Sequence, residues 1–259
     1  MKSLILALVS ALTLQFTIAG ENFPNCGNID ETDEGGVWDV TLTSHYLTKY
    51  VFIGAVSHDD PVIQSDITVA FLNGLSFNIW WSTDMEREQT WGDEFDYTIT
   101  YAKSFAEFDL DASISYFDCY KLLKSQGDSF DVKVKVGHDW EISENQTVVP
   151  FAELNYYIPT QADGGSNGIV VEVGAKQSYQ LNKTFLFSHQ PSLLYDTGAY
   201  GMDSGSILKY QVGLEARIND HLNFDIGVQA WKMLSSFNGD VRGVDGDQLV
   251  GMAGFTFTW

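Results

Sequence analysis

The chain has 259 residues and a formal net charge of −21, with 35 acidic side chains against 14 basic ones. A chain this acidic repels a phosphate backbone, so the composition argues against nucleic acid as a partner. Only five prolines occur and aromatic residues make up 14% of the chain, a balance that suits a protein built of strands.

The first 19 residues have the features of a secretory signal peptide. Lys2 supplies the positive start, Leu4–Leu14 forms a short apolar core, and Thr17 and Ala19 occupy the −3 and −1 positions of a cleavage site. The apolar run is too short for a transmembrane helix, which needs about 20 residues. The mature chain then has about 240 residues, enough for one large barrel or one to two soluble domains.

Residues 20–36 are expected to form an acidic periplasmic segment that contains Asp30–Glu34. No calcium-loop spacing is present, so a solvated tail is favoured over a cation site. The two cysteines, Cys26 and Cys119, would invite a disulfide in an exported chain. We predict that they do not pair, because the topology derived next puts them on opposite sides of a membrane.

Residues 37–259 alternate between apolar and polar side chains with period two, which predicts an all-β domain of twelve strands. In chain order these are Trp38–Val56, Val62–Leu72, Leu75–Thr83, Glu94–Lys103, Glu107–Phe117, Ser129–Trp140, Thr147–Tyr157, Gly168–Tyr179, Thr184–Asp196, Ser206–Arg217, Leu222–Leu234 and Gln248–Trp259.

The connections alternate between short turns and long polar loops. The turns contain Asn73-Gly74, Ser104-Phe105, Glu141–Gln146, Gln180–Lys183 and Ile218–His221, and the loops are Asp84–Asp93, Asp118–Asp128, Ile158–Asn167, Thr197–Gly205 and Ser235–Asp247. Periplasmic turns and extracellular loops of a transmembrane antiparallel meander barrel follow this rhythm. Because twelve is even, both chain ends are expected on the periplasmic side.

The last strand is amphipathic up to its final residue. One face carries Leu249, Gly251, Ala253, Phe255, Phe257 and Trp259, and the other carries Gln248, Gly254, Thr256 and Thr258. The closing strand of an outer-membrane barrel has this character because its outer face meets lipid. Gly254, Phe257 and Trp259 fit the terminal signal read by the barrel-assembly machinery, whereas Met252 departs from it.

A secreted soluble sandwich or jelly roll would also alternate, and a soluble binding module is therefore the competing fold class. The membrane interpretation is favoured by aromatic residues at strand ends, where an interfacial girdle would lie. They are Phe95, Tyr101, Phe108, Tyr116, Tyr156 and Tyr179.

In the segment Tyr50–Gln64, a Tyr-Val-Phe-Ile-Gly stretch precedes a serine, an acidic pair, a proline and a glutamine. This segment resembles the opening hairpin of the TorF-like family of bacterial outer-membrane porins. Gly74 and the later Trp80–Ser82 are similar to the family's next motif, so the resemblance spans Ser44–Ser82. Ile53 stands where the family usually has Arg. The resemblance implies a porin-like barrel.

The residues offer little support for an enzyme. No His-Glu-x-x-His motif occurs, although barrel hydrolases need a His beside a nucleophile or carboxylate. Ser188 and His189 are adjacent in a strand and therefore point to opposite faces. His58 with Asp59 and Asp60 could bind a metal, but a solvated acidic loop is the preferred interpretation. We expect no catalytic residue, no metal site and no cofactor.

The inward charged side chains are the predicted functional set. The pore-lining residues are Asp39, Asp66, Asp96, Asp109, Asp111, Asp131, Lys133, Lys135, Glu153, Glu172, Lys176, Lys209, Glu215, Arg217 and Asp225. An excess of acids in a narrow aqueous path concentrates cations and repels anions. The prediction is an outer-membrane channel for small hydrophilic solutes, with a preference for cations.

A blocked barrel remains the alternative. Twelve strands make a narrow barrel, and Trp80, Phe151, Tyr157 and Trp231 would point inward and narrow it further. The charged groups could pair with one another across the lumen and fill it. The protein would then be a structural or adhesive outer-membrane barrel.

Overall fold

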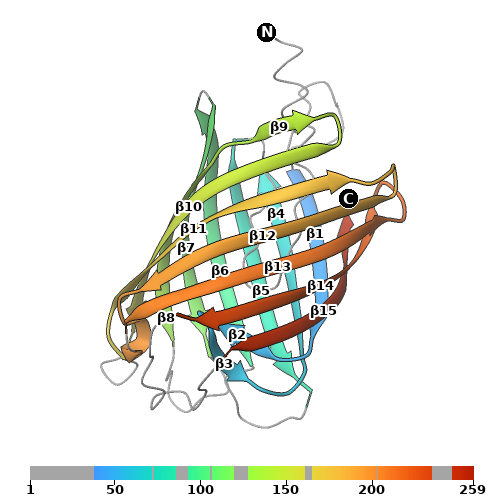
Figure 1. Cartoon of the computed structure of the whole chain (residues 1–259). Helices are drawn as coiled ribbons and strands as arrows, with labels where there is room; N and C mark the ends of the chain where they lie inside the picture. Colours follow the sequence, from blue (N-terminus) through green and yellow to red (C-terminus); the bar gives the residue numbers. More distant parts are fainter. Residues whose placement is uncertain are drawn as a thin grey trace.

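The computed structural model describes residues 38–71, 73–85, 93–105, 107–119, 128–160, 165–202, 204–234 and 247–259. Within these ranges twelve long strands form one closed antiparallel barrel (Figure 1). They are β1 (Trp38–Leu47), β4 (Val62–Phe71), β5 (Leu75–Asp84), β6 (Glu94–Phe105), β7 (Phe108–Asp118), β8 (Ser129–Gly137), β10 (Gln146–Pro159), β11 (Gly168–Gln180), β12 (Phe185–Asp196), β13 (Gly205–Arg217), β14 (Leu222–Met233) and β15 (Gln248–Thr258). The predicted all-β meander barrel of twelve strands is confirmed.

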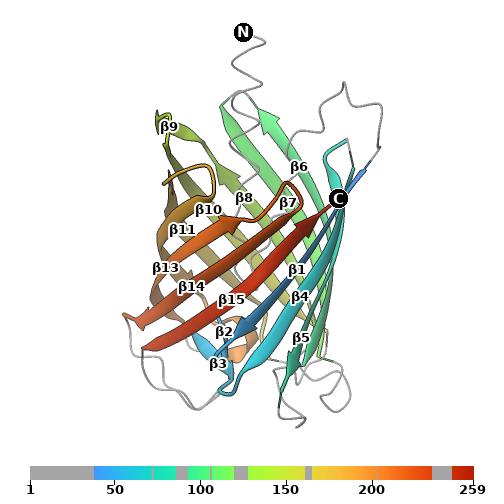
Figure 2. The same ribbon diagram turned by 90° about the vertical axis from the view of Figure 1, so that its right-hand side faces the viewer.

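The first and last strands close the ring. β1 pairs with β15 from Thr41 opposite Thr258 to Leu47 opposite Met252, and β10 pairs with β11 to complete the circuit. Figure 2 shows β1 and β15 side by side along this seam. Every barrel strand is thereby hydrogen-bonded on both edges, as a chain without free sheet edges requires.

The two ends of the barrel differ. The end that holds the C-terminus, the start of β1 and the short β9 (Trp140–Ser143) is called the turn end. The opposite end, called the loop end, holds β2 (Tyr50–Phe52), β3 (Ala55–His58) and the 3-10 turn η2 (Ala199–Gly201). The strand bounds keep the predicted order of connections, except that the predicted turn Glu141–Gln146 contains residues of β9. Residues 86–92, 120–127, 161–164 and 235–246 of the predicted long loops lie outside the described residues.

The outer surface of the barrel is apolar. Ile99 and Ile114, on neighbouring strands, are 59% and 58% exposed. Each of the twelve strands contributes at least one exposed large apolar side chain to this surface: Tyr46, Ile67, Phe77, Ile99, Ile114, Val134, Leu154, Val173, Leu193, Leu208, Ile226 and Leu249. An exposed apolar belt around a whole molecule suits contact with lipid rather than with water.

Two predicted strands differ from the observed ones. The region Trp38–Val56 does not form one strand, because β1 ends at Leu47 and the chain then turns back on itself as the β2–β3 hairpin. Ile53 and Gly54 have φ angles of 48° and 74°, a left-handed turn that no continuous strand can contain. The predicted strand Ser129–Trp140 likewise ends at Gly137, and Trp140 begins β9.

Within the described residues, no helix is both long and apolar enough to cross a membrane.

The signal peptide of residues 1–19, the acidic segment of residues 20–36 with Asp30–Glu34, and Cys26 all lie outside the described residues. The expectations for them stay predictions, as does the absence of a disulfide to Cys119.

Candidate functional site: the lumen and its inward hairpin

The register of the sheet puts the fifteen predicted pore-lining residues on the inward-facing rows. In the row that crosses β7, β8, β10 and β11, Asp111 is opposite Lys135, Lys135 is opposite Glu153, and Glu153 is opposite Glu172. Seven of these side chains are buried, seven are half-buried, and Lys209 is 0% exposed. Arg217, at the end of β13, is exposed. That this set lines a conducting path stays a prediction.

Bases on the inner wall lie beside acids and aromatic rings. The Nζ atom of Lys209 is 3.7 Å from a carboxylate oxygen of Glu172 and 5.0 Å from the ring centre of Trp231. The Nζ atom of Lys133 is 4.0 Å from a carboxylate oxygen of Glu153. Buried charges are tolerated when they are paired in this way. These contacts join side chains along the wall, so a lumen filled by charges that pair across it stays the alternative prediction.

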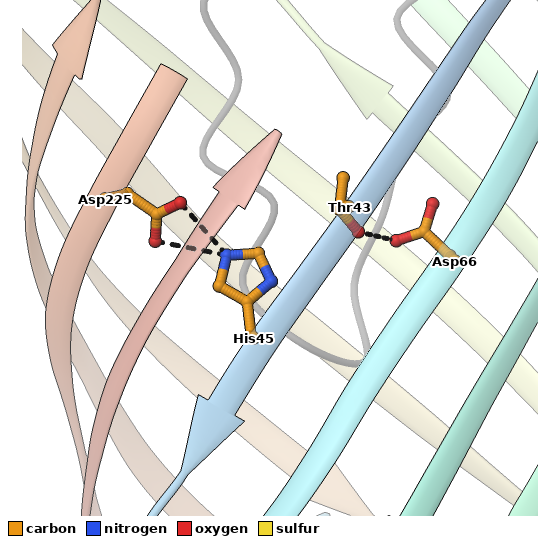
Figure 3. A network of polar contacts seen from close by, with 4 residues as sticks. All are labelled: Thr43, His45, Asp66 and Asp225. Atoms are coloured by element: carbon orange, nitrogen blue, oxygen red, sulfur yellow. Dashed lines mark hydrogen bonds and ion pairs between the residues drawn. The ribbon is translucent and has the colours of Figure 1, made fainter. Parts of the chain in front are cut away.

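A second polar network lies across the seam of the barrel (Figure 3). His45 Nε2 of β1 is 3.0 and 3.1 Å from the two carboxylate oxygens of Asp225 in β14. Thr43 donates a hydrogen bond to Asp66 of β4, and the Asn78 amide donates to the same carboxylate at 3.2 Å. These side chains are all buried, so the network connects strands on both sides of the closing strand β15.

Gly254 makes the contact between His45 and Asp225 possible. It lies in β15 directly opposite His45 on one side and Asp225 on the other. A Cβ atom built on Gly254 would lie 2.7 Å from Cγ of His45 and closer still to its Cδ2. The sequence identified Gly254 only as part of a terminal signal. Its packing role could not be seen without the register, because it depends on residues about 30 and 210 positions away.

Phe257 and Trp259 face outward at the turn end, and their ring centres are 5.1 Å apart. The backbone N–H of Trp259 donates to the Val40 carbonyl at 3.1 Å, and Trp259 accepts from the Val40 N–H at 3.2 Å. The final residue is thus tied to the first strand. The predicted role of these residues as an assembly signal stays a prediction.

The β2–β3 hairpin occupies the loop end of the lumen, and sequence reasoning did not find it. Tyr50, Val51 and Ile53 are buried in one apolar cluster, and Phe52 packs against it. The Phe52 ring lies edge-on to the rings of Phe117, Tyr157 and Tyr200, with centre distances of 6.3, 5.8 and 5.9 Å. The apolar run Tyr50–Val56 is the signal for this segment, but from the sequence alone it predicts a continuation of the first strand.

Tyr200 joins the hairpin to the wall from η2. Its hydroxyl is 2.6 Å from the Ser129 hydroxyl. Burial raises the pKa of the Tyr200 hydroxyl well above its usual range, so this group stays a neutral hydrogen-bonding partner. The second polar attachment is Tyr50, whose hydroxyl donates to a carboxylate oxygen of Glu94 at 2.9 Å.

Within the described ranges, no group of three or more His, Cys, Asp or Glu residues is arranged to hold a metal ion. Ser188 is buried on the inner face, whereas the neighbouring His189 lies among the rings of Tyr179, Phe187 and Tyr210. The two side chains therefore point to opposite faces, as the strand period predicts.

No protein-family model matches the chain, and no curated protein matches it either. In structure the chain is similar to the NanC porin, with a TM-score of 0.54 and 14% sequence identity over 84% of this chain and 98% of that one. It is also similar to the KdgM porin, with a TM-score of 0.52 and 11% identity over 85% and 99% of the two chains. A further similar structure is an outer membrane channel from Pseudomonas putida F1, with a TM-score of 0.53 and 9% identity over 90% and 100%.

At this level of identity the likeness establishes the fold. The chain has the barrel architecture of outer-membrane porins and channels. The narrower resemblance to the TorF-like family stays a prediction, since no family model matches.

Proposed function

We propose that the protein is a porin-like channel of the bacterial outer membrane that passes small hydrophilic solutes passively, with a preference for cations. The observation that carries the proposal is the inversion of the barrel: apolar side chains face out, and charged or polar side chains face in. Lipid would contact the outer surface, and an inner wall with more acids than bases would attract cations.

Four further points support this proposal. The signal peptide of residues 1–19 would export the chain, and the terminal strand with Gly254, Phe257 and Trp259 would present it to the barrel-assembly machinery. One structure of the same fold is a KdgM porin in complex with disordered oligogalacturonate, at a TM-score of 0.50 and 10% identity, so a polar solute is a ligand of one such barrel. The segment Tyr50–Gln64 resembles TorF-like porins, and the proposal includes no enzymatic activity.

The test is single-channel recording of the refolded protein in a planar bilayer, with the reversal potential measured in a salt gradient. A cation-preferring channel gives discrete steps and a reversal potential of the sign set by cations. Replacing Asp109 and Asp111 with Asn should shift the potential towards zero, because both acids belong to the predicted pore-lining set and share the inward row with Lys135 in the register of β7 and β8.

The matched control is the double variant Glu141→Gln and Asp220→Asn, which removes two exposed acids at the same end of the barrel. It should leave the reversal potential unchanged. An identical shift in both double variants would show that surface charge, and not the lumen, sets the preference.

Partitioning tests the membrane location separately. The protein should stay with outer membranes after carbonate extraction and should migrate differently on gels before and after boiling. Release as a soluble species would contradict the membrane location and favour a secreted binding module.

A further inference from the structure

The connection between β1 and β4 folds into the barrel instead of away from it. Residues 48–61 leave β1, form the β2–β3 hairpin and return to β4, and Figure 2 shows β2 and β3 within the loop end of the barrel. The hairpin is a sheet of its own, with Tyr50 opposite His58, Val51 opposite Val56 and Phe52 opposite Ala55. Its strands pair with each other and with no other strand of the described residues.

The hairpin packs against wall residues from around the circumference of the barrel. Tyr50 lies against Trp80 of β5, with ring centres 6.0 Å apart. Phe52 reaches Phe117 of β7 and Tyr157 of β10. The same apolar cluster includes residues of β11 to β15, namely Val170, Leu194, Ile207, Trp231, Val250 and Met252. The result is an apolar septum that spans the lumen from wall to wall.

The tip of the hairpin reaches the wall formed by β13 and β14. A Cβ atom on Gly54 would lie 3.2 Å from Cδ1 of Ile207 and in direct conflict with Cε of Met233. Together with its φ of 74°, this close approach explains a glycine at the tip. Apolar packing therefore holds the tip of the hairpin against the wall. Because apolar packing is not directional, the tip can leave this position and return to it.

The polar attachments gather at the base of the hairpin. Lys49 Nζ is 2.5 Å from a carboxylate oxygen of Asp59, so an exposed ion pair joins the two stems. The backbone N–H of Thr48 donates to the Gly251 carbonyl of β15 at 3.0 Å. A short hairpin with a fixed base and an apolar tip can move as a unit while the barrel stays closed.

We propose that residues 50–58 form a gate for the channel, a step that rests on the function proposed above. With the hairpin seated, the apolar septum separates the polar lumen from the loop end and stops hydrated ions and hydrophilic solutes, as hydrophobic constrictions do. When the hairpin swings outward about its two stems, the septum is lost and the inner wall becomes continuous with the outside.

The first test removes the gate. Residues 49–59 are replaced by a short Gly-Ser linker, correct folding is checked by heat-modifiable migration, and currents are recorded in a planar bilayer. The proposal expects brief openings for the full chain and continuous openings of larger conductance for the deleted form. Equal conductance and equal open time in both would overturn the gate while leaving the channel intact. A correctly folded deleted form that carries no current would overturn the channel itself, and the gate with it.

The second test locks the gate without deleting it. In a background with Cys26 and Cys119 replaced by Ser, Phe52→Cys and Tyr157→Cys are joined by a short thiol-specific linker that contains a reducible bond. Current should be lost on crosslinking and should return on reduction. Current that persists through verified crosslinking would overturn the proposal.

The matched control for the locked gate is the pair Lys103→Cys and Leu110→Cys, which lie opposite each other on β6 and β7, outside the hairpin. Crosslinking this pair joins two strands of the fixed wall and should leave the outward swing of the hairpin, and therefore the current, unchanged. Loss of current in the control would mean that the crosslinking itself stops the current, which would overturn the assignment of the block to hairpin movement.

Discussion

Replacement of Gly254 by alanine tests whether the seam of the barrel depends on the contact between His45 and Asp225. Gly254 is on the same rung as both residues, and the imidazole passes over it to reach the carboxylate. The added methyl group would lie 2.7 Å from Cγ of His45. It would also meet the backbone carbonyl of Ser44, so the imidazole must move and the wall offers it no simple relief.

The expected loss of stability is about 3 kcal/mol. Leaving a buried group without its hydrogen-bond partner costs about 1–3 kcal/mol, and overpacking a filled interior costs about 1–3 kcal/mol. Partial relaxation of the imidazole keeps the expected loss below the upper end of the sum of these two costs. The sign of the change in stability distinguishes the two cases, because alanine in place of glycine in a strand would otherwise stabilise the protein by about 0.5–1 kcal/mol.

Urea unfolding of the refolded barrel in detergent, followed by tryptophan fluorescence and by heat-modifiable migration, measures this change. Gly251→Ala is the matched control in the same strand, because its nearest contact is the Thr48 methyl group at 3.3 Å and no backbone atom of another segment lies within 4 Å. The control should be neutral or slightly stabilised.

A double-mutant cycle identifies the cause. In a His45→Ala background, Gly254→Ala should cost at least about 1 kcal/mol less than in the parent, since the main obstacle is gone. The reasoning is refuted if Gly254→Ala is as stable as Gly251→Ala, or if its cost is the same with and without the imidazole.

Two further variants test the inner wall and the turn end. Lys209→Met keeps the length of the side chain but removes the cation beside Glu172, and should lower the free energy of unfolding in urea by about 3 kcal/mol. The control Lys232→Met, at an exposed lysine, should change the free energy of unfolding by no more than about 0.5 kcal/mol. Equal unfolding midpoints for the two variants would contradict the buried pairing. Asp139 lies between β8 and β9, where burial, followed by the charge of Asp109, raises the pKa of its carboxyl above 3.8. The folded chain therefore holds this proton more tightly than the unfolded chain, so stability falls as the pH rises from 3.8 through the raised pKa. The variant Asp139→Asn should lack this loss of stability. Parallel profiles of stability against pH for the parent and the variant would contradict the raised pKa of Asp139.

The strands of the barrel were predictable because alternation in the sequence maps directly onto the two faces of a sheet. Ile99 and Ile114 follow that period and face outward, as expected. The same period fixed which charged residues share the inner rows, since one shift of register would have moved them all to the outside. What the period cannot specify is the partner of each residue across the ring.

The hairpin was hidden for a related reason. Tyr50–Val56 is apolar enough to extend a membrane strand, and its turn at Ile53 and Gly54 carries no proline or Asn-Gly pair to announce it. Only the surrounding wall, built from residues up to Met252, makes inward burial of this run more favourable than continuation. Tertiary packing decided the outcome, as it often does for apolar segments of ambiguous length.

The seam between β1 and β15 also sets the order of folding events. Thr41 pairs with Thr258 and Leu47 with Met252, so the ring cannot close until two strands far apart in the sequence have both formed. Before that moment both seam strands present unpaired N–H and C=O groups along their full length, a state prone to joining other chains. Closure therefore joins the two barrel strands that are farthest apart in the sequence. Until they have paired, this protein most needs an environment that keeps it from other chains.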